Sequence, residues 1–160
     1  MAKAGENQFT ATIAWTGNTG VGTQTYNSYT RNWNVEVPGK PTIPCSNDPE
    51  LGGDPTLMNP EDMLLSALAG CHMLWYLHLA AVAGVTVTDY RDEPLGIGET
   101  TPNGAGRFTK ATLRPTITVV PGTDLAKAEA IHHKIHNYCY IARSMNFPVE
   151  IAATFLEEKG

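Results

Sequence analysis

The sequence is poor in charge, and its few charges are mostly negative. Charged residues make up 17% of the 160 residues, and 11 Lys and Arg stand against 16 Asp and Glu, a net charge of −5. Binding to nucleic-acid phosphates needs a basic surface, so we expect no nucleic-acid partner. Hydrophobic residues make up 42%, which supplies a core and excludes a disordered chain. The length predicts a single domain over residues 1–160.

Cysteine is also scarce. Three cysteines are too few for a disulfide-stapled scaffold, and no two have C-x-x-C spacing. The first seven residues contain no apolar stretch, so the sequence predicts no signal peptide and a reducing, cytoplasmic location. In that compartment a cysteine pair is more often catalytic than structural. The simpler alternative is that Cys71 and Cys139 are core cysteines, since free Cys is among the most buried residue types.

Charged residues are absent from Met63 to Ala83, a run of 21 residues that is long enough for a transmembrane candidate. His72 and His78 lie within the run, and no basic cluster flanks it, which argues against a membrane span. We predict a helix buried on all sides, beginning at Asn59-Pro60 and ending at Gly84, with both histidines as hydrogen-bonded core residues. A chain of this length covers such a helix poorly, which points to an interlocked oligomer rather than a membrane partner.

Alternating apolar residues predict strands on both sides of this helix. The expected strands cover residues 9–15, 21–26, 33–37, 85–90, 107–120 and 149–155. A second helix with one buried stripe is expected from Thr123 to Asn146. Six of the eleven prolines lie between Pro38 and Pro60, which indicates a long ordered loop. The order β-β-β-α-β-β-α-β predicts an α+β fold.

Two sequence motifs occur on these two helices, one on each, and their order along the chain is informative. The first is Asn59-Pro60-Glu61-Asp62 followed by Ala69-Gly70-Cys71, and the second is the stretch 136–142 with Pro148 shortly after it. Together they resemble the signatures of the OsmC/Ohr family of thiol-dependent peroxidases, the osmotically inducible and organic hydroperoxide resistance proteins. The tryptophan-containing run 71–77 resembles an OsmC-like branch more closely than classical Ohr enzymes.

The resemblance implies a mechanism and a set of site residues. Cys71 would attack an organic hydroperoxide, and the resulting sulfenic acid would condense with Cys139 to a disulfide that an external dithiol reduces. Arg31 would stabilise the thiolate, and Glu61 would hold that arginine. The simpler alternatives are that Arg31 is a solvated loop arginine and that Glu61 is an acid at a helix N-terminus. Cys45 matches neither family cysteine. An OsmC-like, intertwined homodimer is expected, with an apolar pocket around the attacking thiol and neither cofactor nor metal.

Other interpretations remain open. His132, His136 and Cys139 share one helical stripe that can hold a metal ion, since His and Cys are the usual zinc ligands; otherwise these histidines line the outer or pocket edge of the helix. A cysteine hydrolase would pair Cys71 with His72 or His136, but the sequence has no visible oxyanion motif. A non-catalytic stress protein that binds a metal or ligand is the main alternative to a peroxidase.

Overall fold

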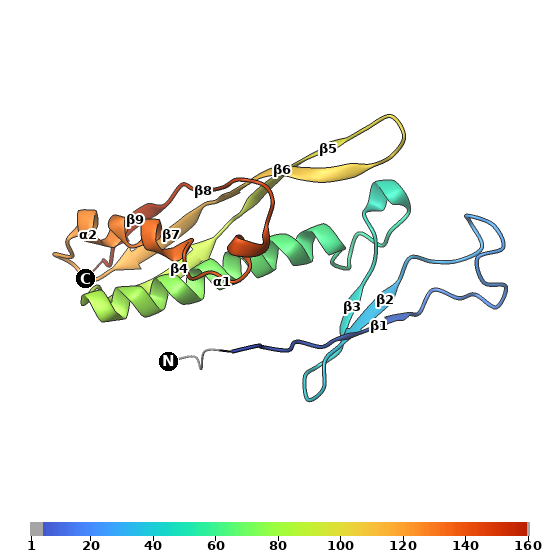
Figure 1. The fold of residues 1–160 in the computed structure, drawn as a ribbon, viewed down its shortest axis with the longest axis horizontal. Coiled ribbons are helices and arrows are strands. Elements are labelled where there is room, and N and C mark those ends of the chain that lie inside the picture. Colours follow the sequence, from blue (N-terminus) through green and yellow to red (C-terminus); the bar gives the residue numbers. More distant parts are fainter. Residues whose placement is uncertain (1–4, 160) are drawn as a thin grey trace. The chain divides into compact units, whose positions relative to one another are not determined.

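The computed structural model describes residues 5–159 and divides into two compact units, which meet in sequence between Met63 and Leu64 (Figure 1). The first unit contains one sheet, and the second contains two sheets and most of the helices. The mixed α+β class is confirmed. A single domain over residues 1–160 stays a prediction.

The sheet of the first unit is antiparallel, in the order β1-β2-β3. Its strands are β1 (Thr12–Trp15), β2 (Trp33–Glu36) and β3 (Ile43–Cys45), and a 3₁₀ turn η1 (Pro49–Leu51) follows. The predicted strand over 21–26 is wrong. That stretch is a loop, because the Asn18 side chain accepts hydrogen bonds from the backbone of Gly20 and Gly22 at 2.9 and 3.0 Å and so competes with strand pairing.

The long helix α1 (Pro60–Ala83) begins and ends where the sequence predicts. The backbone N–H of Asp62 donates to Asn59 Oδ1 at 2.7 Å, and the N–H of Asn59 donates to Asp62 Oδ2 at 3.1 Å. This reciprocal pair satisfies free amides of the first turn. At the other end Gly84 has a φ of 72°, a left-handed conformation that glycine adopts without strain.

The second unit contains two three-stranded sheets, β4-β7-β9 and β5-β6-β8. The strands are β4 (Val87–Asp92), β5 (Leu95–Thr100), β6 (Gly106–Leu113), β7 (Pro115–Val119), β8 (Val149–Ile151) and β9 (Thr154–Glu157). The expected strand over 107–120 is two strands, because the chain passes from one sheet to the other at Arg114, just before Pro115. The expected strand over 149–155 divides in the same way.

The second predicted helix is broken into α2 (Leu125–Ala130), α3 (His132–Ile135) and a 3₁₀ turn η2 (Ala142–Ser144). Asn, aromatic and β-branched residues follow α3, and all are weak helix formers. The predicted buried stripe is nevertheless present, except at Leu125, which is 42% exposed. The buried members of the stripe are Ala128, Ile131, Ile135, Cys139 and Ala142.

The core of the second unit lies between α1, strands β6 and β7, and the α2–α3 segment (Figure 1). Leu68, Tyr76 and Ala80 of α1 are almost fully buried in it. The opposite face of α1 is exposed, with Leu74 at 65% and Val82 at 74%. The prediction of burial on all sides is therefore wrong for the chain taken alone. Helix α1 is long and apolar enough to cross a membrane. This is weak evidence for a membrane span, because buried core helices can have the same length and composition.

Candidate active site

The structure brings Cys71 and Cys139 together. Their Sγ atoms lie 2.7 Å apart, although both cysteines are free. Cys71 is half-buried near the middle of α1, and Cys139 is fully buried just after α3. A disulfide needs a separation of about 2.05 Å, so closure requires a movement of less than one ångström between the sulfur atoms.

Cys139 is held in place by the backbone around it. Its N–H donates to the Ile135 carbonyl at 2.8 Å, and its sulfur accepts from the N–H of Ala142 at 3.3 Å. Burial, together with the hydrogen bond to Cys71, raises the pKa of the Cys139 thiol to about 11. Near neutral pH Cys139 therefore keeps its proton and donates it to the sulfur of Cys71.

A stacked aromatic pair flanks the two thiols. Trp75 lies one helical turn after Cys71, Tyr138 immediately precedes Cys139, and their ring centroids are 5.1 Å apart. The rings of Trp75 and His78 are nearly perpendicular, with centroids 5.7 Å apart. Tyr138 is 51% exposed and Trp75 is half-buried, so this pair, the Trp75–Tyr138 wall, is partly accessible from solvent.

Arg31 and Glu61 belong to the first unit, and their relation to the thiols stays a prediction. The Arg31 guanidinium donates to the carbonyls of Tyr29 and Tyr26 at 3.0 and 2.8 Å and lies over both rings. These contacts hold the arginine in a fixed orientation at the base of its loop. Glu61 is exposed in the first turn of α1, while the neighbouring Asp62 is used by the helix cap.

A protein-family model described as OsmC-like protein matches residues 52–154, more than half of the chain. The chain belongs to the OsmC-like family. The matched stretch includes Glu61, Cys71 and Cys139, whereas Arg31 lies before it.

Solved OsmC-like structures share the fold. An OsmC-like protein of unknown function from Vibrio cholerae is 29% identical, with a TM-score of 0.81 over 92% of this chain and 99% of its own. An organic hydroperoxide resistance protein OsmC from Legionella pneumophila is 21% identical, with a TM-score of 0.65 and coverages of 94% and 98%. One from Elizabethkingia anophelis is 17% identical, with a TM-score of 0.66 and coverages of 96% and 99%. No curated protein matches the chain.

The histidines of this OsmC-like chain agree with the predictions only in part. His72 is a buried, hydrogen-bonded core residue as predicted, but His78 is exposed and that prediction is wrong. His132 does not line an outer edge: it is 7% exposed, and its Nδ1 lies 2.9 Å from Nε2 of His72. No sequence pattern indicates this pair, because the two residues are sixty positions apart. Within residues 5–159, no three His, Cys, Asp or Glu side chains gather as a metal site would require.

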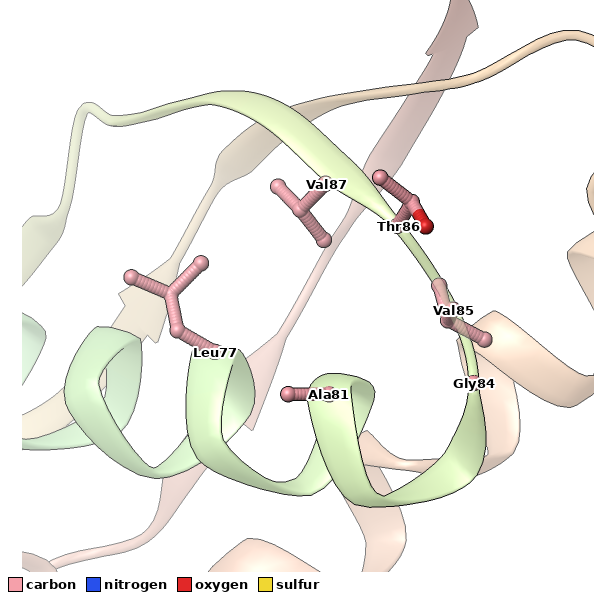
Figure 2. Close-up of a pocket in the computed structure, with 6 residues that line it drawn as sticks. All are labelled: Leu77, Ala81, Gly84, Val85, Thr86 and Val87. Carbon is pink, nitrogen blue, oxygen red and sulfur yellow. The ribbon is translucent and has the colours of Figure 1, made fainter.

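An open pocket of about 490 Å³ lies at the end of α1 (Figure 2). Leu77 and Ala81 of the helix face the chain that follows Gly84 and leads into β4, and these elements line the pocket. Cys71 is not among the lining residues. The predicted apolar pocket around Cys71 therefore stays a prediction, supported by the partly exposed Trp75–Tyr138 wall rather than by this cavity.

The buried histidines predict a pH-dependent stability. Burial lowers the pKa of His72, and that of His132, from 6.5 to about 4. The unfolded chain therefore binds more protons between these pH values, so the free energy of unfolding falls as the pH is lowered through the window. The slope is up to about 1.4 kcal/mol per pH unit for each imidazole. Urea midpoints at pH 7 and 5 measure it: His72→Gln should flatten the slope, and His136→Gln, at an exposed position, should not. Equal slopes in all three proteins would contradict the prediction.

Proposed function

We propose that this protein is a thiol-dependent peroxidase that reduces organic hydroperoxides, with Cys71 as the attacking thiol and Cys139 as the resolving thiol. The observation that carries the proposal is the 2.7 Å contact between a half-buried and a fully buried free thiol. Family membership supports it, since two of the structural relatives are named as organic hydroperoxide resistance proteins. Oxidative stress defence is the corresponding role.

The difference in exposure between the two thiols supports this assignment. Cys71 is only half-buried, whereas Cys139 is fully buried and keeps its proton near neutral pH. In the first step the Cys71 thiolate attacks a peroxide oxygen, the O–O bond breaks, and the alkoxide leaves as an alcohol after taking up a proton. The product is a Cys71 sulfenic acid.

The second step closes the disulfide. The Cys139 sulfur attacks the sulfur of the sulfenic acid, the S–O bond breaks, and hydroxide leaves as water with the thiol proton. An external dithiol then reduces the disulfide by exchange through its own thiolate, and both cysteines return to the free state. The cycle needs no cofactor, because the dithiol supplies both electrons.

Organic rather than inorganic peroxides suit the surroundings of the thiols. The Trp75–Tyr138 wall offers apolar contact area to the organic part of a hydroperoxide, and burial of such area is favourable. We place the reaction in the cytoplasm and in a homodimer.

The decisive experiment is a turnover assay with purified protein. Reduced wild type should consume cumene or tert-butyl hydroperoxide in the presence of a dithiol, and should show a lower kcat/KM for hydrogen peroxide. A protein with accessible thiols and no hydroperoxide consumption would favour the alternative of a non-catalytic, ligand-binding member of the family.

Arg31→Ala should slow the reaction by leaving fewer Cys71 thiolates. A guanidinium near a thiol stabilises the thiolate, which is the reacting form, so we expect kcat/KM and the rate of Cys71 alkylation at pH 7 to fall roughly tenfold or more. Arg91→Ala is the matched control, because Arg91 is an exposed arginine that pairs with Glu93. Unchanged alkylation in Arg31→Ala would remove this arginine from the site.

A further inference from the structure

A buried histidine pair joins the two segments that hold the thiols. His72 follows Cys71 on α1, and His132 begins α3, the short helix that leads to Cys139. The rings lie nearly parallel, with an interplanar angle of 8° and a hydrogen-bond distance of 2.9 Å. The two histidines are only 5% and 7% exposed. The proposed reaction uses neither of them.

A second polar contact lies one turn further along α1. The Tyr76 hydroxyl donates to the Ala128 carbonyl of α2 at 3.2 Å, and the Tyr76 ring stacks on His132 with centroids 4.5 Å apart. Positions 72 and 76 thus bond to positions 132 and 128, which run the opposite way along the chain. Two directional contacts, one turn apart, fix how the α2–α3 segment lies along α1, which apolar packing alone fixes less strictly.

The pair holds together as neutral imidazoles. One ring nitrogen must donate and the other accept, so the bond is lost when both rings are protonated. Nε2 of His132 has no hydrogen-bond partner among the described residues, so a proton there would be buried without an acceptor. Burial lowers the pKa of both rings, and the charges of His72 and His133 lower that of His132 further. Burial, together with the nearby charge of Glu129, raises the pKa of the neighbouring Tyr76. Burial and the charge of Asp92 raise the pKa of Tyr90.

We infer that the His72–His132 pair is a positioning device: it holds α3 against α1, keeps Cys139 beside Cys71, and so sets the rate of disulfide closure rather than the rate of attack on the peroxide. The inference rests on the proposed peroxidase function. Consecutive helix residues point about 100° apart, and the imidazole of His72 bonds to His132. His72 is therefore a positioning residue and takes no part in the attack by Cys71.

Position matters most at the closing step. The sulfenic acid at Cys71 has two fates: it condenses with the Cys139 thiol, losing water, or it meets a second hydroperoxide and becomes a sulfinic acid. A displacement of about 1 Å can slow a reaction between held groups by up to roughly a hundredfold. A loosened α3 should therefore favour overoxidation.

Three substitutions of His72 separate the hydrogen bond from simple burial. His72→Leu removes the bond and leaves Nδ1 of His132 without a partner. His72→Gln places an amide near the position of Nε2 and can donate or accept. The amide of His72→Asn is one carbon shorter and stops short of His132, so His72→Asn is a polar variant that lacks the contact even if His72→Leu fails to fold.

Two rates are measured on the reduced proteins without added dithiol. The first is the rate of the initial burst of cumene hydroperoxide consumption, which reports attack by Cys71. The second is the rate at which the Cys71–Cys139 disulfide forms. It is measured by quenching samples with acid, alkylating the free thiols and determining the intact mass. We expect His72→Leu and His72→Asn to close the disulfide at least about tenfold more slowly, with a burst within about twofold of wild type and more sulfinic acid. His72→Gln should restore closure. Equal losses in both rates, or normal closure in His72→Asn, would overturn the inference.

A further arm works without any peroxidase activity. Diamide, a diazene that oxidises two thiols to a disulfide and is itself reduced to the hydrazine, should close the disulfide in wild type and His72→Gln faster than in His72→Asn. If wild type consumes no hydroperoxide yet this order holds, the proposed function fails and the positioning role stands. If turnover is normal and the order is absent, the positioning role fails alone.

Discussion

Cys71→Ser is expected to abolish hydroperoxide reduction, whereas Cys139→Ser is expected to allow one oxidation per chain and then stall. The hydroxyl of serine does not ionise near neutral pH, so the attacking nucleophile is lost in the first variant. In the second, the sulfenic acid at Cys71 has no neighbouring thiol and proceeds to sulfinic acid when peroxide is in excess. Stopped-flow measurement of peroxide loss, with intact mass of the product, distinguishes the two variants.

Cys45→Ser is the matched control for both. Cys45 is fully buried in the first unit, its Sγ lies 3.6 Å from Met63 Sδ, and burial raises the pKa of its thiol. Such a thiol is inert, so turnover should stay close to that of wild type. Equal residual turnover in Cys71→Ser and Cys139→Ser, or a large loss in Cys45→Ser, would mean that the thiol pair has been wrongly assigned.

The parts of the fold that the sequence predicted are those with strong local signals. The limits of α1 follow from the Asn59–Asp62 cap and from Gly84, which act over a few residues. The burial of Cys139 follows from its place in an apolar stripe, although the helix that was expected to carry it is interrupted. The burial of Cys139 depends on the pattern of apolar side chains and does not require a regular helix at this position.

The parts that were missed depend on contacts between distant residues. Strand β5 was not predicted, because Gly96 and Gly98 interrupt its apolar alternation; its pairing with β6 supplies the stability. At Gly96 a Cβ would lie 2.4 Å from the Phe108 ring, so any other residue there would force that ring to move. The His72–His132 bond likewise joins residues whose proximity only the tertiary fold creates.

The second prediction with a large expected effect concerns an active site shared between two copies of the chain. Helix α1 is continuous from Pro60 to Ala83, so Glu61 and Cys71, ten residues apart, are separated by about 15 Å along its axis and point about 80° apart. Glu61 therefore does not reach Cys71 of its own helix directly. Two α1 helices packed antiparallel about a two-fold axis would bring the start of one towards the middle of the other.

The exposed face of α1 supports such a pairing. Leu74 and Val82 lie on it two turns apart, with Ala67, His78 and Ala81 also exposed. Burying each large apolar side chain is worth about 1.5–3 kcal/mol, so covering this face favours a second copy. The expected assembly is an obligate, intertwined homodimer in which each site takes Glu61 from the partner of the chain that supplies Cys71 and Cys139.

Complementation tests the composite site. Cys71→Ser and Glu61→Ala are each expected to be inactive, but co-refolded heterodimers should contain one intact site. Random pairing would restore about a quarter of the wild-type turnover per chain. A mixture of Cys71→Ser and Cys139→Ser is the matched control and should remain inactive, because both thiols of a site come from one chain. A monomer in solution, or no recovery in heterodimers confirmed by mass, would rule the shared site out.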